Sequence, residues 1–188
     1  MGNAATQPRM TAEEFLAWEA GQVERHEFVD GEVFAMSGAE ARHVTACMNV
    51  AFALRQHLAD RPCDAYMSDM KVAAANKRDF FYPDVVVTCS PADQQDRLVV
   101  VQEPTLIVEV LSPSTAAYDL GDKFAHYQDI PSLREIAFID LDLRRTSVHR
   151  KGADGLWVLH RFDAGMDVRF ASVDLTITAE ALFAKVRE

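Results

Sequence analysis

The sequence predicts an α/β or α+β domain that is rich in strands and has two main helices. Short apolar segments typical of strands recur along most of the chain, and the stretches 39–58 and 119–129 are expected to be helical. The 188 residues suffice for one well-buried core and hardly for two, and no internal repeat or low-complexity tract marks a linker. We therefore expect a loose lead-in over residues 1–10 and a single domain over residues 11–188.

The first third of the chain is expected to form a short helix, a β-hairpin and a long helix. Thr11 followed by Glu14 is a capping box, which predicts the start of the short helix. Asp-Gly at 30–31 separates two alternating segments and favours the tight turn of an antiparallel hairpin. From 39 to 58, apolar residues recur every three or four positions, so one face of a long helix should be buried, with His43 near its start.

The later elements follow from apolar runs that are separated by polar turns. Strands are expected at 63–67, 70–74, just after Asp84, and at 104–111, with a surface loop at 90–97. After the helix at 119–129 we expect a strand at 135–140, a hairpin of the segments 146–150 and 156–161, a strand at 173–178 and a final helix at 179–186.

The charge balance argues against a protein that coats nucleic acid. The formal net charge is −10, from 29 acidic and 19 basic residues, so a polyanionic substrate would need metal ions or a local basic patch. Arg144, Arg145, Arg150 and Lys151 are candidates for such a patch, although an exposed hairpin rich in arginine is the commoner meaning of such a run. The chain has no P-loop, no Gly-x-Gly-x-x-Gly motif and no evident Ser-His-Asp or Cys-His set, so nucleotide-cofactor chemistry has no support.

The cysteines indicate a reducing compartment. Cys47, Cys63 and Cys89 are an odd number without metal-type spacing, and each lies in or beside an apolar segment. We expect reduced, mostly packed thiols of an intracellular protein. No stretch approaches a membrane span and no signal-peptide pattern is seen, so a cytoplasmic location is expected.

Two acids interrupt strongly apolar strands. Glu109 lies within the run 104–111, which has apolar residues on both faces of its pleat. An ionised carboxylate there needs a cation, a raised pKa or a bound metal. Asp84 follows Pro83 at the end of a second apolar strand, and two such strands side by side would offer carboxylates to a hard cation such as Mg²⁺. The plainer alternative makes Asp84 a turn residue and Glu109 the partner of a core arginine.

Three further residues have weaker signals. Lys123 shares a helix face with Asp119 and Tyr127, four positions away on either side, and a surface Asp119–Lys123 pair is the ordinary explanation. Glu27 precedes a hairpin turn, where acids are often solvated. His43 lies near a helix start, where histidines are more often structural than catalytic.

Motifs in the segments 27–32, 37–43, 83–87, 104–115 and 119–127 together resemble the Uma2 family of bacterial proteins. That family, formerly a domain of unknown function, belongs to the PD-(D/E)XK, or restriction-endonuclease-like, superfamily. The resemblance covers about residues 11–150, and the stretch Val-Glu-Val-Leu-Ser-Pro-Ser-Thr is its most specific part. It implies a restriction-endonuclease-like core, in which helices flank a central mixed β-sheet, with an N-terminal and a C-terminal β-hairpin.

The resemblance also implies roles for particular residues. Asp84 and Glu109 would be metal ligands, with Glu27 as a third acid, while His43 and Tyr127 would support the ligands or contact phosphate. The superfamily places a lysine two residues after the glutamate, but that position holds Leu111. The family pattern instead has a lysine on the following helix, which is Lys123, and Lys71 is the alternative.

These inferences lead to a Mg²⁺- or Mn²⁺-dependent endonuclease that hydrolyses phosphodiester bonds in nucleic acid, with DNA preferred over RNA as substrate. One competing hypothesis is a non-catalytic binding or assembly module on a nuclease-like fold. Another is a buried Glu109–Lys123 ion pair without metal, whose loss by Glu109→Ala would cost about 3 to 5 kcal/mol. The alternating strands within 146–161 offer an edge for a homodimer.

Overall fold

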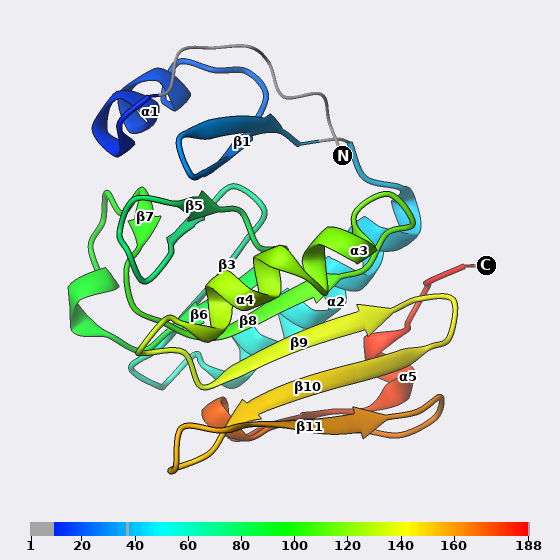
Figure 1. Cartoon of the computed structure of the whole chain (residues 1–188). Helices are drawn as coiled ribbons and strands as arrows, with labels where there is room; N and C mark the ends of the chain where they lie inside the picture. Colours follow the sequence, from blue (N-terminus) through cyan, green and yellow to red (C-terminus); the bar gives the residue numbers. More distant parts are fainter. Residues whose placement is uncertain (1–9, 37, 188) are drawn as a thin grey trace.

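A six-stranded mixed sheet forms the middle of the fold (Figure 1). In this computed structural model, residues 10–36 and 38–187 are described, so most of the expected lead-in and residue 37 lie outside the described residues. The strand order is β11-β10-β9-β8-β6-β3. The bounds of these strands are β3 Asp64–Met67, β6 Val85–Thr88, β8 Pro104–Val110, β9 Glu135–Asp140, β10 Arg145–Lys151 and β11 Trp157–Phe162. Only β8 and β9 run parallel among these neighbours, and the C-terminal hairpin of β10 and β11 is as predicted.

The two acid-bearing strands are neighbours, as the sequence predicts. β6 and β8 are antiparallel, with Val85 opposite Val108. Asp84 immediately precedes β6 and therefore lies across from Glu109 in β8. Both strands are almost entirely buried, since helices or loops cover both faces of the sheet at this point.

Helices cover the two faces of the sheet. α2 (Ala41–His57) packs through residues such as Val50 and Leu54 on the face that carries Val108, and this helix confirms the predicted periodicity. α3 (Ala116–Asp119) and α4 (Asp122–Gln128) replace the predicted helix over 119–129. The chain breaks its helical course at Gly121, where an added Cβ would lie 2.9 Å from the carbonyl oxygen of Ala117. Tyr127 in α4 packs on the face opposite α2.

A smaller five-stranded sheet, of order β2-β1-β5-β4-β7, lies beside the first. Its strands are β1 His26–Val29, β2 Glu32–Ala35, β4 Lys71–Ala73, β5 Phe80–Phe81 and β7 Val100–Val101. The β1–β2 hairpin turns at Asp30 and Gly31, which have φ of 52° and 85°, as the Asp-Gly signal predicts. α1 (Ala12–Glu19) begins at the predicted capping box and packs Phe15 on Phe28, with ring centroids 4.6 Å apart. This sheet brings Glu27 toward the main one.

The C-terminal part differs from the prediction in detail. β12 (Val168–Phe170) pairs with β13 (Leu175–Ile177), and only the second of these strands is predicted from the sequence. α5 (Ala179–Leu182) is shorter than the expected helix over 179–186. Two short 3₁₀ segments, Pro91–Asp93 and Ala171–Val173, complete the elements.

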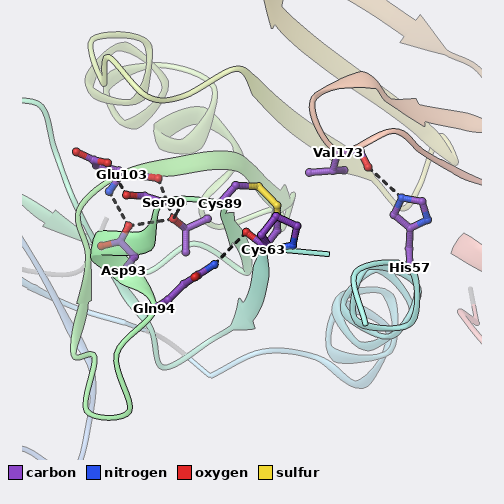
Figure 2. Close-up of a disulfide and its surroundings, with 10 residues drawn as sticks. His57, Cys63, Cys89, Ser90, Asp93, Gln94, Glu103 and Val173 are labelled. Carbon is purple, nitrogen blue, oxygen red and sulfur yellow. Dashed lines mark hydrogen bonds between the residues drawn. A yellow bond between two sulfur atoms is a disulfide. The ribbon is translucent and has the colours of Figure 1, made fainter. Parts of the chain in front are cut away.

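The prediction of three reduced thiols is wrong. Cys63 and Cys89 form a disulfide, which Figure 2 shows at the end of the β3–β6 pair. Asp64 lies opposite Thr88 in this antiparallel pair, so the residues just beyond them face each other. Cys47 is a free, buried thiol, as expected. In the part of the chain that the structure describes, no helix is both long and apolar enough to cross a membrane.

Candidate active site

A buried lysine joins acids from three elements. The Nζ atom of Lys123 lies 2.9 Å from Oε1 of Glu27 and 2.9 Å from Oε1 of Glu109, and 3.6 Å from Oδ1 of Asp119. All four side chains are less than a tenth exposed. The predicted Asp119–Lys123 pair is therefore present, but it is part of a buried cluster and not a surface pair. The helix break at Gly121 separates Asp119 in α3 from Lys123 in α4.

Asp84 adjoins this cluster through the β6–β8 pairing. Its backbone N–H donates to Oε2 of Glu109 at 3.3 Å, and the backbone N–H of Val110 donates to Oδ2 of Asp84 at 2.6 Å. The side chain of Asp84 is 22% exposed, whereas that of Glu109 is 4% exposed. Asp84 therefore lies on the side of the cluster that solvent reaches.

His43 holds the outer side of Asp84. Its Nε2 atom lies 2.9 Å from the carbonyl oxygen of Val110 and 3.3 Å from Oδ2 of Asp84. Since both of these groups are acceptors, Nε2 carries the proton, and Nδ1 faces the thiol of Cys47 at 3.6 Å. The hydrogen bond to Asp84 raises the pKa of His43, although burial opposes it. The histidine thus has a fixed orientation toward the carboxylate.

Tyrosines complete the surroundings of the acids. The hydroxyl of Tyr127 is fully buried and donates to Oε1 of Glu109 at 2.7 Å. Burial and the charge of Glu109 raise the pKa of Tyr127 well above its usual value, so this hydroxyl remains a donor. The backbone N–H of Tyr82 donates to Oε1 of Glu27 at 3.1 Å. The buried hydroxyl of Tyr118 has no hydrogen-bond partner within residues 10–36 and 38–187, and the carboxylate of Glu27 contributes to its raised pKa.

The cluster has more negative than positive charge. Burial raises the pKa of Glu109 to about 8, because Lys123 offsets only part of the effect of burial and of the charges on Asp84 and Asp119. Burial likewise raises the pKa of Asp119. Burial alone would lower the pKa of Lys123, but Glu109 and Glu27 outweigh it and raise this pKa well above its usual value. The lysine is therefore charged, and a further cation would relieve the excess of carboxylates.

The donor atoms suit a hard divalent cation. Carboxylate oxygens are the ligands that Mg²⁺ and Mn²⁺ prefer, and Asp84 and Glu109 supply them from adjacent strands. His43, Cys47 and Asp84 also place one ligand atom each within 4.8 Å of one another. Burial raises the pKa of the Cys47 thiol far above its usual value, which disfavours the thiolate that a softer metal would require. The residues present therefore fit Mg²⁺ or Mn²⁺ better than a thiolate-bound metal.

Some sequence candidates lie elsewhere. Lys71, the alternative lysine, donates from Nζ to the hydroxyl of Tyr82 at 3.2 Å, and that hydroxyl donates to Oε1 of Glu19 at 2.9 Å. It belongs to a separate network beside the cluster, with the ring of His26 3.0 Å from Glu19.

The expected basic patch does not form one surface. Arg145 binds Asp163 at 2.8 Å, and Arg150 binds the buried Glu135 at 2.7 Å. Lys151 lies over the ring of Trp157. Of the four bases, Arg144 alone lines a pocket in the described chain.

Sequence reasoning missed one member of the cluster. Asp119 is recognised only as a surface partner of Lys123, because the helical spacing gives no sign of the break at Gly121 that turns both residues inward. The available signal is the run Asp119-Leu120-Gly121-Asp122, in which an exposed helix would not need a glycine.

Known proteins share this sequence and this fold. The Uma2 family, described as "Putative restriction endonuclease", matches residues 12–180. Two uncharacterized proteins of Synechocystis sp. are similar: slr1290 is 32% identical over 176 residues, covering 94% of this chain and 92% of that protein, and sll1609 is 36% identical over 156 residues, covering 82% and 88%. A crystal structure from Anabaena variabilis, described as "a putative nuclease belonging to DUF820", has a TM-score of 0.77 at 16% identity and covers 95% of this chain and 99% of that one. This likeness confirms the expected nuclease-like α+β fold.

Proposed function

Because the chain belongs to the Uma2 family, we propose that it is a metal-dependent endonuclease that hydrolyses phosphodiester bonds of nucleic acid. One observation carries the proposal: two acids from adjacent strands, Asp84 and Glu109, meet at one end of a buried sheet beside a single charged lysine. The description of the family and that of the Anabaena variabilis protein, a nuclease in both cases, support the same reaction class.

The residues would divide the chemistry among them. Asp84 and Glu109 would hold Mg²⁺ or Mn²⁺, with Glu27 as the third acid. The bound cation would polarise the phosphate and lower the pKa of a water molecule. Lys123 would orient the attacking water and offset the negative charge that develops on the phosphate. Tyr127 fixes the carboxylate of Glu109 by its hydrogen bond, which keeps the ligand in position.

His43 would act on the outer ligand. Its Nε2–H reaches both the carbonyl oxygen of Val110 and the carboxylate of Asp84, so the ring would hold this carboxylate at the sheet end. The partial exposure of Asp84 is where a phosphate of the substrate would approach.

A cleavage assay tests this proposal. Wild-type protein is incubated with supercoiled plasmid DNA, and separately with single- and double-stranded RNA, in Mg²⁺, in Mn²⁺ and in EDTA. We expect metal-dependent cleavage, lost in Glu109→Gln and Asp84→Asn and kept in Glu180→Gln, which changes an exposed acid in α5. Cleavage that persists in Glu109→Gln would point to a contaminating nuclease and would contradict the proposed site.

A second candidate, a non-catalytic binding or assembly module, is favoured by the position of the lysine. Lys123 is surrounded by three carboxylates, and position 111, where the superfamily has its lysine, holds leucine. A binding module would keep its function in Glu109→Gln, whereas a metal-dependent nuclease would lose activity. The same variant therefore separates the two candidates.

A homodimer through β11 is a further part of the proposal. β11 is the outer strand of the six-stranded sheet, and Val158 and Leu159 in it are each 52% exposed. An open strand edge with exposed apolar side chains can pair with a second copy. Light scattering should give the mass of a dimer for the wild type and of a monomer for Leu159→Glu, and a monomeric wild type would contradict this part.

A further inference from the structure

Three arginines line a pocket that the proposed mechanism does not use. The pocket has a volume of about 440 Å³, within the range of ligand-binding cavities, and Arg42, Arg144 and Arg187 form part of its wall. Asp142 is the acid among its lining residues. In a chain with a net charge of −10, such a local excess of positive charge favours an anion.

The fold holds these arginines in defined positions. Arg42 lies in the first turn of α2, and its Nη1 atom binds Oδ1 of Asp142 at 2.7 Å. Arg144 has a φ of 47° in the turn between β9 and β10, and its guanidinium lies over the ring of Phe183, 5.5 Å from the centroid. Its Nη2 atom also donates to the carbonyl oxygen of Val186 at 3.4 Å. A stacked guanidinium still offers donors at its edge, and the planar fork of arginine matches the oxygens of a phosphate.

The pocket lies at the same edge of the sheet as the acids. β8 and β9 are parallel, with Val110 opposite Ile139, so the end of β8 that carries Glu109 and the turn that follows β9 share one edge. In Figure 1, the start of α2 lies near α3 on the side toward which β9 points. Arg42 directly precedes His43, which contacts Asp84. A chain of phosphates that enters at Asp84 would therefore pass this pocket.

We propose that the arginine pocket, formed by Arg42, Arg144 and Arg187, binds a backbone phosphate of the nucleic acid whose neighbouring phosphodiester reaches Asp84 and Glu109. This inference rests on the proposed function, because it gives that site its means of holding a polyanion. Asp142 opposes the anion and occupies Arg42 in the free protein. Binding of the phosphate would release Arg42 from this pair.

The test measures binding without cleavage. Fluorescence anisotropy in EDTA follows a labelled DNA duplex, and an RNA duplex of the same sequence, over a range of salt concentrations. The variants Arg187→Gln, Arg144→Gln and Asp142→Asn are compared with Arg161→Gln, which removes an exposed charge on β11 outside the pocket. Circular dichroism checks that each variant folds, and Arg187→Gln serves even where loss of the Arg144 stack destabilises the chain.

The expected pattern has opposite signs for the bases and the acid. Each arginine variant should weaken binding at least about threefold and should lower the slope of log affinity against log salt by about 1. Asp142→Asn should strengthen binding, since it removes the repelling charge. If Arg42 and Asp142 only tether α2 to the turn, Asp142→Asn would not strengthen binding.

The outcomes separate this inference from the proposed function. If the wild type binds a duplex and the pocket variants bind as Arg161→Gln does, the inference is wrong, while metal-dependent cleavage by the wild type would leave the proposed function standing. If the wild type binds neither duplex, the inference is also wrong. A DNA duplex bound more tightly than the RNA duplex, or the reverse, identifies the source of the phosphate.

Discussion

Replacing Lys123 with methionine removes the positive charge that Glu27, Glu109 and Asp119 share. The lysine is 6% exposed, so solvent cannot replace it, and the carboxylates would remain buried together without it. Breaking a buried ion pair by removing one partner costs about 3 to 5 kcal/mol. For a chain of this size, that loss corresponds to a melting temperature lower by about 6 to 20 °C.

Glu109→Gln removes an oxygen charge from the same ion pair, but a much smaller effect is expected. Its amide oxygen can still accept from Tyr127, and Lys123 keeps Glu27 at 2.9 Å and Asp119 at 3.6 Å. The raised pKa of Glu109 means that the protein already tolerates this side chain in a neutral form. We therefore expect the free energy of unfolding in EDTA to change by less than about 1 kcal/mol.

Urea and thermal denaturation in EDTA, followed by circular dichroism, compare the two variants. Lys77→Met is the matched control, because Lys77 is exposed and should change stability by less than about 0.5 kcal/mol. Equal, large losses in Lys123→Met and Glu109→Gln would refute the reasoning and favour an isolated structural ion pair. No loss in Lys123→Met would show that the cluster does not depend on a charged lysine.

Three further outcomes are expected. In EDTA, the free energy of unfolding should fall as the pH rises from about 4.5 to about 8, because folded Glu109 keeps its proton over this range and the unfolded chain does not. Glu109→Gln should remove that slope in urea titrations, and an unchanged slope would speak against the raised pKa. His43→Ala should weaken Mn²⁺ binding about 10- to 100-fold by calorimetry, because the ring holds Asp84; equal affinity would deny it that role. Reducing the Cys63–Cys89 disulfide should lower stability by about 2 to 4 kcal/mol in urea titrations, and Cys63→Ser should be insensitive to the reductant.

The acids at the sheet end can be found from the sequence because they violate a pattern. Glu109 interrupts a run that is apolar on both faces, and Asp84 closes a second such run. Only two strands of this kind carry a single acid, so their pairing is a reasonable prediction, and the register of β6 and β8 confirms it. Lys123 is found through the family resemblance and not through its spacing, which suggests a surface pair.

Features that join distant segments cannot be predicted in this way. The Cys63–Cys89 disulfide depends on the register of β3 and β6, across a separation of 26 residues. The arginine pocket combines the start of α2, the turn after β9 and the end of the chain. Local patterns of hydrophobicity predict elements but do not specify which loop ends meet. The sequence therefore assigns Arg144 to a hairpin patch, although its structural neighbours are Phe183 and Val186.

The most direct test of the proposed site is calorimetric titration of Mn²⁺ into the wild type, Asp84→Asn, Glu109→Gln and the control Glu180→Gln. We predict stoichiometric binding to the wild type and the control and its loss in both site variants, since the two carboxylates supply the ligands. Titration of the wild type with a bound non-cleavable duplex covers a site that needs substrate oxygens. The absence of binding by folded wild type under both conditions, or undiminished binding by Asp84→Asn and Glu109→Gln, would contradict the proposed metal site.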